Sequence, residues 1–352
     1  MRTFYYRYIY NNSWIGQRII KTGIAVFITA AICLRYDLPA VFAVITAIVT
    51  LEPTASDSIK KGVVRFPASA IGAGFAVLFV SLFGNSPVTF MLAAILTITL
   101  CQKLKLHHGT LVATLTAVAM IPDIHDHFFL AFITRLGTTT IGLTVSTLVN
   151  LLILPPRYVP FITNQIKNHY EDIQQVFSET IEHLKNNETT SKQREIPFSS
   201  YISLRRSIEK TQEMTNYQEL EWKYHRINHG EFRLLKSLKR QLNILQKMSL
   251  HLGNLQYIDK DIDFTDYEMV LLDRASYFIR SSLKNLQEEM SDDHYYVIYE
   301  LDQYLKYDYS SGHRKDPEFF HHFHAKTVVF YEVLSFHDCL EELQHHLNRP
   351  DS

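Results

Sequence analysis

The sequence contains a run of 37 residues, from Phe66 to Gln102, without a single Asp, Glu, Lys or Arg. Shorter charge-free runs occupy residues 22–34, 38–51, 109–122 and 136–156. A helix needs about 20 apolar residues to span the hydrocarbon core of a bilayer, and long charge-free runs are typical of such helices. A large soluble core is the alternative, but it would have to bury all these runs inside an otherwise charge-rich chain. We therefore predict an integral membrane region.

Charge divides the chain into two parts near Pro156. Up to that residue there are 11 Lys and Arg against 5 Asp and Glu, whereas the remainder has 24 against 31. The formal net charge of −1 therefore hides a net charge of +6 in the first part and −7 in the second. We expect residues 1–156 to form a membrane transport domain of six helices, and residues 157–352 to form a cytoplasmic, all-helical domain.

Polar and turn residues cut the apolar region into six predicted crossings, at 18–35, 38–51, 60–83, 88–102, 108–122 and 129–154. The amino end lacks the small-residue cleavage site of a signal peptide, so we expect the first crossing to remain in the protein. Alternate loops carry Lys60 and Lys61 or Lys103 and Lys105, whereas Asp123 lies in a loop of the opposite side. By the positive-inside rule, we expect a multi-pass protein of the cell membrane with both termini in the cytoplasm.

The stretch RFPASAIG at 65–72 returns seventy positions later as RLGTTTIG at 135–142. The same shift aligns Ala43 with Ala113 and Thr46-Ala47 with Thr116-Ala117 without a gap. Each unit of this repeat would hold three crossings, which is an odd number, so the second unit must enter the membrane upside down. We predict an all-α membrane bundle built as an inverted 3+3 repeat. Small residues four apart, at 68, 72 and 76, predict a close helix contact within it.

The repeated arginines, Arg65 and Arg135, are candidate binding residues for an anion. An arginine at the centre of a membrane helix costs about 2.5 to 3.5 kcal/mol on insertion scales, so it persists where it faces protein, water or an anion. Arg65 equally fits a cytoplasmic positive-inside anchor beside Lys60 and Lys61. This alternative is weaker for Arg135, which stands toward the outer face, where positive charge is scarce.

The second and fifth crossings supply about 14 residues each, or roughly 21 Å of helix, against a hydrocarbon core of about 30 Å. Both are bounded by Pro or Gly, and short interrupted segments in matching positions of two repeats are typical of a transport site. The hydroxyls of four residues would line it, namely Thr46, Thr50, Thr114 and Thr116. The alternative is that each hydroxyl bonds its own helix backbone. Glu52, beside the second crossing, could carry a proton or be a simple helix-end residue.

Four stretches carry a resemblance to a known family: GQRIIKTGIAV at 16–26, PAVFAVITAIVTLEPT at 39–54, the two Arg-to-Ile-Gly crossings, and VNLLILPPRY at 149–158. In this order they resemble the bacterial aromatic acid exporter family, in its single-unit form with a soluble carboxy-terminal domain, and the fusaric acid resistance-type efflux proteins related to it. The resemblance implies efflux of small organic anions, foremost aromatic carboxylates. Because longer members carry two units, it also implies a homodimer.

The tail after residue 160 has long stretches with apolar residues at three- and four-residue spacing, at 164–185, 231–252, 267–290 and 318–347, and we expect a loop at 186–197. Its histidines, among them His321, His324 and His337, raise the question of a metal site. Adjacent histidines point to different faces and no cysteine pair accompanies them, so we expect no metal. No phosphate loop or nucleophile motif is present either. We expect no cofactor, no enzyme activity and no nucleic-acid partner.

The sequence thus favours a membrane exporter in contact with the lipid bilayer. The rival interpretation is a membrane-anchored interaction or sensing protein, in which the six helices only hold a tail that recruits a cytoplasmic partner.

Overall fold

The computed structural model describes residues 16–124, 127–185, 191–225, 229–258, 262–311 and 325–348, with the backbone alone for 191–197 and 308–311. The described residues form twelve α-helices and two short 3-10 helices, and none of them lies in a strand. The predicted all-α class is therefore confirmed.

The chain divides into two compact units. Unit 1 comprises Met1–Arg157 together with Tyr217–Arg226, and unit 2 comprises Tyr158–Asn216 and Ile227–Ser352. Sequence analysis assigned the segment Tyr217–Arg226 to the soluble tail, whereas its packing places it with the apolar helices.

Unit 1 contains the six helices of the apolar region: α2 (Gln17–Arg35), α3 (Ala40–Thr50), α4 (Ala55–Phe83), α5 (Pro87–Lys103), α6 (Thr110–Met120) and α7 (Phe128–Leu152). Each predicted crossing coincides with one of them. Three helices, α2, α4 and α7, are long and apolar enough to cross a membrane, while α3 and α5 are shorter apolar helices. That all six elements cross the bilayer stays a prediction.

Local sequence explains where these helices begin and end. The Thr54 side chain accepts a hydrogen bond from the Asp57 backbone N–H and caps α4, which ends at Gly84 with φ of 62°. Pro39 precedes α3, and α6 lies between the 3-10 helices η1 (His107–Gly109) and η2 (Ile121–Asp123). The two helices that sequence analysis marked as short have 11 residues each.

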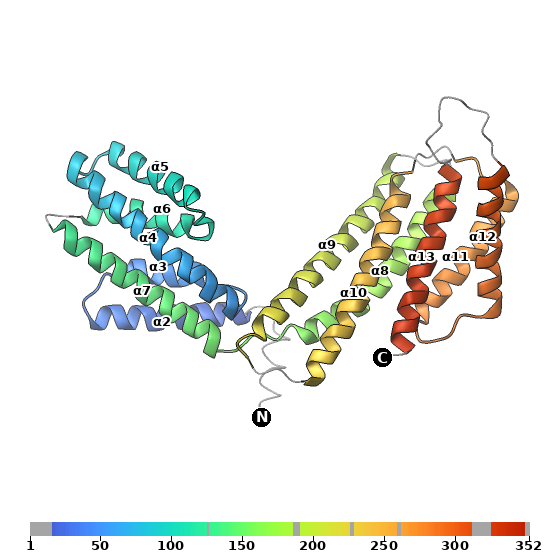
Figure 1. Cartoon of the computed structure of the whole chain (residues 1–352), viewed down its shortest axis with the longest axis horizontal. Coiled ribbons are helices and arrows are strands. Elements are labelled where there is room, and N and C mark those ends of the chain that lie inside the picture. The colour runs from blue at the N-terminus through green and yellow to red at the C-terminus, as the bar shows by residue number, and fades with distance from the viewer. Residues whose placement is uncertain are drawn as a thin grey trace. The chain divides into compact units, whose positions relative to one another are not determined.

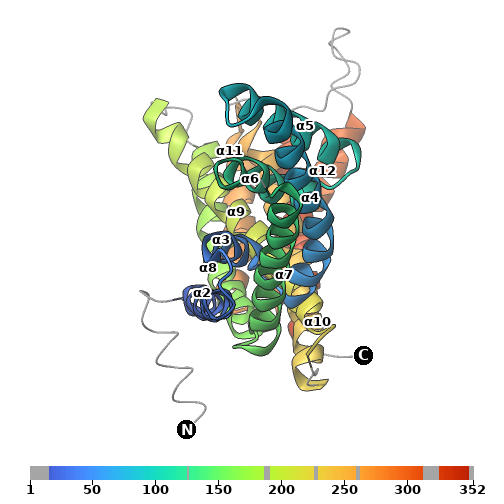
Figure 2. The same ribbon diagram turned by 90° about the vertical axis from the view of Figure 1, so that its left-hand side faces the viewer.

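Helices α4 and α7 run side by side through unit 1, with α5 and α6 on one side and α2 and α3 on the other (Figure 1), and Figure 2 shows the same grouping from another direction. Each long helix of this pair carries one short helix: α6 packs on α4, and α3 packs on α7. Ser69 of α4 faces Thr139 of α7, and Gly62 of α4 lies near Thr147, so the two long helices are antiparallel.

The repeated glycines make the closest of these contacts. A Cβ on Gly72 would stand 2.2 Å from the carbonyl oxygen of Ala113, and a Cβ on Gly142 would stand 2.4 Å from that of Ala43. The two glycines are seventy positions apart in the sequence, and so are the two alanines. The predicted small-residue contact of α4 is thus real, and its partner is α6 of the same chain.

Two apolar clusters flank a polar layer in unit 1. One joins the second half of α4 to α5, α6 and η2 around Phe79, Met120 and Ile121. The other joins α2 to the second half of α7 around Ala25, Val145 and Val149. Because α4 and α7 are antiparallel, the clusters lie at opposite ends of the pair, and the buried hydroxyls of Ser69 and Thr139 lie between them.

Unit 2 is built from α8 (Val159–Lys185), α9 (Ser191–Glu221), α10 (His229–Gln256), α11 (Asp266–Lys284), α12 (Asp292–Ser311) and α13 (Ala325–Asn348), with the end of α9 belonging to unit 1. In its core, the rings of Phe177 and Phe336 stack with centroids 4.7 Å apart. Thr265 and Glu268 form a capping box at the start of α11.

The prediction of a loop at 186–197 is wrong for residues 191–197, which form the first turns of α9. Among the described side chains of α9, the buried positions Tyr201, Leu204, Ile208, Thr211 and Thr215 follow helical spacing. Two of these five are threonines, so the apolar pattern that indicates a helix is diluted.

Candidate anion site and its ion pairs

Arg135 of α7 is a buried cation that forms no ion pair with any described residue, although the charge of Asp123 acts on it at longer range. Its Nη2 donates a hydrogen bond to Thr116 Oγ1 at 2.8 Å, and its guanidinium carbon lies 4.1 Å from the centroid of the Phe42 ring. The Nε and Nη1 atoms have no hydrogen-bond partner in the described part of the chain, although the residue is only 6% exposed. A buried charge with open donors is costly, so this arrangement is typical of a binding position for an anion.

A series of hydroxyl groups extends from the Thr116 contact of this arginine. Thr116 Oγ1 lies 3.0 Å from Ser69 Oγ, which in turn lies 3.3 Å from Thr139 Oγ1. All three hydroxyl-bearing residues are fully buried. Together with the guanidinium they form a polar layer drawn from α4, α6 and α7, and we refer to Arg135, Thr116, Ser69, Thr139 and Phe42 as the Arg135 site.

Arg65 of α4 has a different environment. Its Nη2 donates to Glu52 Oε1 at 2.6 Å and its Nε donates to the carbonyl of His108 at 3.2 Å. The other carboxylate oxygen of Glu52 accepts from Lys61 Nζ at 2.8 Å. Arg65 is thus already paired with an acid inside the chain.

Glu52 lies in the segment between α3 and α4 and is held by these two cations. Burial acts to raise the pKa of its carboxyl, but the hydrogen bonds and charges of Lys61 and Arg65 outweigh burial and leave the pKa below its ordinary value. The ionised form is therefore the stable one in this structure.

The four threonines named by sequence analysis separate into two groups. Thr46 and Thr114 each donate to a carbonyl one turn back in their own helix, at 2.9 Å, as the backbone-bonding alternative predicts. Thr50 also bonds its own helix, but its hydroxyl lies 2.6 Å from Ser146 Oγ of α7. Only Thr116 of the four reaches Arg135 within the described residues.

Sequence analysis did not identify Ser69 or Phe42. Ser69 could have been found, because it lies seventy positions before Thr139 and is a hydroxyl in both repeats. Phe42 carries no such signal, since the shift pairs it with Val112 and one phenylalanine among many in an apolar helix is unremarkable by sequence.

A second polar cluster joins α2, α4 and α7. Lys21 Nζ donates to Asn150 Oδ1 at 2.8 Å, and Asn150 Nδ2 donates to the carbonyls of Glu52 and Thr54 and to Ser58 Oγ, at 2.7 to 3.0 Å. Asn150 is fully buried with its amide satisfied on both sides. The cluster holds the start of α4 against the end of α7.

The segment Tyr217–Arg226 attaches to the same ends of α4 and α7. Glu221 Oε2 accepts a hydrogen bond from the Ala55 backbone N–H at 2.9 Å, where the first turn of α4 offers free donors to a negative group. The Nε2 of His225 donates to the carbonyl of Leu151 at 2.9 Å. Burial raises the pKa of the Glu221 carboxyl, although the Ala55 hydrogen bond and the nearby charges of His225 and Lys21 oppose this.

Comparisons with known proteins agree with this arrangement of units. Residues 13–153 match the family described as aromatic acid exporter family member 1. Over the full length, the chain is 43% identical to a UPF0421 protein of Bacillus cereus across 332 residues, which cover 94% of this chain and 93% of the relative. It is 36% identical to a UPF0421 protein of Halalkalibacterium halodurans, covering 94% and 89% of the two chains.

A UPF0421 protein of Staphylococcus haemolyticus is 39% identical over 274 residues, covering 77% of this chain and 82% of the relative. The relatives match the tail as well as the apolar part, and the exporter family matches the helices that hold the Arg135 site. The chain therefore belongs to the UPF0421 proteins, and through residues 13–153 to the aromatic acid exporter family.

Proposed function

We propose that the protein exports small organic anions, foremost aromatic carboxylates, and that Arg135 binds the carboxylate. One observation carries this proposal: Arg135 is buried, forms no ion pair in the described part of the chain, and keeps two donor nitrogens without a described acceptor. Membership of an exporter family supports transport as the activity.

The Arg135 site has the chemistry to bind a carboxylate. A guanidinium offers parallel N–H donors that match the two oxygens of a carboxylate, and such charge-assisted pairs are about twice as strong as neutral hydrogen bonds. The Phe42 ring stacked on the guanidinium supplies an apolar neighbour at the same point. The carboxylate of an aromatic acid would therefore bind the guanidinium, and its ring would pack against the Phe42 ring.

The proposed topology is a six-crossing bundle with an inverted 3+3 repeat. The reciprocal contacts of Gly72 with Ala113 and of Gly142 with Ala43 support it, because an inverted repeat makes each such contact occur twice. The contact between Ser69 and Thr139, which are equivalent positions, would then lie on the pseudo-two-fold axis.

Both termini are proposed to be cytoplasmic, with residues 157–352 as a cytoplasmic domain of a cell-membrane protein. In this orientation Glu52, Lys61 and Arg65 lie at the inner side of the bundle. We propose Glu52 as the residue for proton coupling, since protonation would release both of the cations that it holds. The working assembly is proposed to be a homodimer.

Transport by purified protein in liposomes tests the proposal. The substrates are benzoate, cyclohexanecarboxylate as a carboxylate without an aromatic ring, and benzamide as a ring without a charge. We expect efflux of benzoate above that of protein-free liposomes, weaker efflux of cyclohexanecarboxylate, and none of benzamide above the leak. Growth of a deletion strain across a panel of aromatic acids gives the cellular counterpart. Absence of transport for every acid, with unchanged growth, would favour the membrane-anchored interaction or sensing protein.

A further inference from the structure

Two histidines in the core of unit 2 have ring nitrogens that no described group satisfies. His294 of α12 and His337 of α13 are 1% and 2% exposed, and their ring centroids lie 5.0 Å apart. Both ring nitrogens of His337 and the Nε2 of His294 lack a hydrogen-bond partner. Buried polar atoms of this kind are rare in folded proteins, and an ion or a water commonly explains them.

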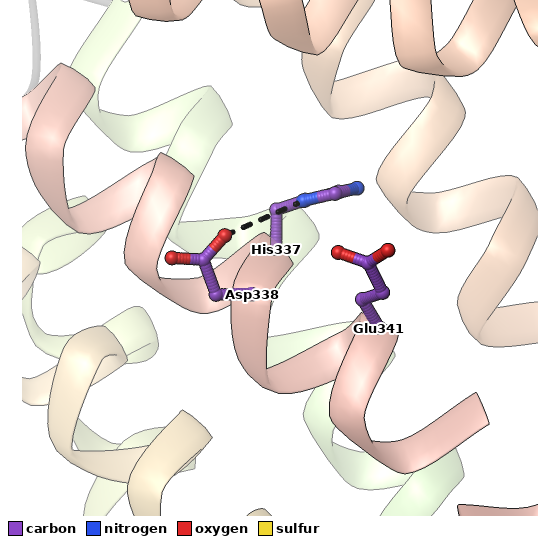
Figure 3. Close-up of side chains that lie close together, drawn as sticks. All are labelled: His337, Asp338 and Glu341. Carbon is purple, nitrogen blue, oxygen red and sulfur yellow. Dashed lines mark ion pairs between the residues drawn. The ribbon is translucent and has the colours of Figure 1, made fainter. Parts of the chain in front are cut away.

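Two carboxylates stand beside the His337 ring. The ligand atoms of His337, Asp338 and Glu341 lie within 4.8 Å of one another, and His337 Nδ1 is 3.9 Å from Asp338 Oδ1. All three side chains project from neighbouring turns of α13 toward a common point (Figure 3). Glu341 follows His337 by four residues, which places both on one helix face. The buried imidazole is thus aimed into an acidic pair that remains exposed to solvent.

The second buried histidine, His294, has one hydrogen-bonded ring nitrogen. His294 Nδ1 lies 3.1 Å from Ser282 Oγ. When Nδ1 donates to this hydroxyl, Nε2 keeps a lone pair that no described group satisfies.

We propose that His337, Asp338 and Glu341 form a binding site for a divalent transition-metal ion, with His294 packed against it from α12. One imidazole nitrogen and two carboxylate oxygens suit Zn²⁺ or Mn²⁺, whereas an all-oxygen set would suit Mg²⁺ or Ca²⁺. Sequence analysis expected no metal here, because adjacent histidines point to different faces and no cysteine pair accompanies them. The structure instead groups a buried imidazole with carboxylates that follow it on the same helix.

Zn²⁺ binding by the full-length protein in detergent tests this site by calorimetry. The informative variant is Asp338→Asn with Glu341→Gln, because both side chains are exposed and the change leaves the core intact. We expect the wild type to bind one Zn²⁺ per chain. The affinity of the variant for this ion should be at least tenfold lower. The matched control is His345→Gln, an exposed histidine of the same helix, which should bind like the wild type.

His321, His322 and His324 lie outside the described residues, and a variant with all three changed to Gln shows whether they account for the bound ion. Its affinity should match the wild type. Replacing Zn²⁺ by Co²⁺ adds a visible absorption band that reports ligand geometry and should disappear in His337→Gln. Equal Zn²⁺ binding by the wild type and the double carboxylate variant, or no Zn²⁺ binding by the wild type, would overturn the proposal.

Discussion

Arg65 and Glu52 form an ion pair, with Nη2 and Oε1 2.6 Å apart, and the residue seventy positions beyond Glu52 is Pro122. The shift of seventy therefore matches the two arginines but not the acid that pairs with Arg65. As a result, Arg65 is neutralised by an ion pair, whereas Arg135 forms none with a described acid. Arg135 contacts the Thr116 hydroxyl and the Phe42 ring, and the charge of Asp123 acts on it at longer range. The two arginines should respond to substitution in opposite ways.

We predict that Arg65→Gln lowers the free energy of unfolding by about 1 to 3 kcal/mol, because it leaves the half-buried Glu52 carboxylate with Lys61 alone. Glu52→Gln should also destabilise. The double variant should lose less free energy of unfolding than the two single variants lose together, with a coupling energy of about 0.5 to 3 kcal/mol. Thermal unfolding in detergent measures this, with the exposed Lys60→Gln as control. Additive losses would show that the pair contributes nothing to stability.

Gly72→Ala and Gly142→Ala should each destabilise unit 1, because the new Cβ would stand 2.2 or 2.4 Å from a backbone carbonyl oxygen that cannot move independently. Overpacking of this kind costs about 1 to 3 kcal/mol or more. The chain supplies matched controls, since a Cβ on Gly74 of α4 or on Gly137 of α7 would meet nothing within 4 Å. Yield of monodisperse protein and thermal midpoint are the measurements. Equal tolerance at all four glycines would contradict the packing.

The sequence was sufficient to locate the six helices of unit 1, because charge is excluded from long apolar runs and Pro and Gly mark their ends. It also predicted the Gly72 contact, since small residues four apart leave room for another backbone. It could not predict which arginine is paired. Glu52 reaches Arg65 across a turn between two helices, and that geometry depends on how α3 and α4 pack.

The attachment of Glu221 to Ala55 was equally inaccessible, because 166 residues separate the two positions and nothing local marks Glu221. Likewise, Phe42 stands beside Arg135 only because α3 packs on α7. Pairings across the fold are set by packing, which a single sequence does not display.

Glu221 should make stability depend on pH. Burial raises the pKa of its carboxyl in the folded state above its ordinary value of 4.5, so the folded state holds the proton more tightly than the unfolded state. Its contribution is fully present below about pH 4.5 and is lost as pH rises through the raised pKa. We predict that Glu221→Gln, which keeps an acceptor for Ala55 N–H, gains thermal stability relative to the wild type between pH 4.5 and 7.5.

Thermal midpoints of the two proteins across this pH range provide the measurement, and the exposed Glu219→Gln is the control. A constant difference between wild type and Glu221→Gln at every pH would show that the carboxyl does not titrate differently in the two states.

The protein should be a dimer in mild detergent, with twice the chain mass of 41.0 kDa. The resemblance to longer family members with two units in one chain is the basis for this expectation. The small-residue face of α4 at 68, 72 and 76 is fully buried within unit 1, so the dimer contact must use another face. Native mass spectrometry and crosslinking in membranes measure the assembly. A monomer by both methods would refute the dimer.

Arg135→Gln should impair transport without impairing folding. Its charge is buried and forms no ion pair with a described acid, so removing it relieves a desolvation cost and should leave the thermal midpoint unchanged or higher. Efflux of benzoate should nevertheless fall at least tenfold, because the carboxylate loses its cation. Arg135→Lys should retain part of the activity, since lysine keeps the charge but not the two parallel donors. Arg65→Gln should reduce efflux less, because Arg65 is already paired with Glu52.

Arg35→Gln is the control for general loss of positive charge, as Arg35 is an exposed arginine at the end of α2. Transport per molecule, measured in liposomes with equal protein content, separates the two interpretations of Arg135. If Arg135→Gln lowers membrane yield or thermal midpoint while transport per molecule is unchanged, Arg135 is a structural partner of Thr116. The repeat of the arginine would then record a duplication of the helices and not a second binding position.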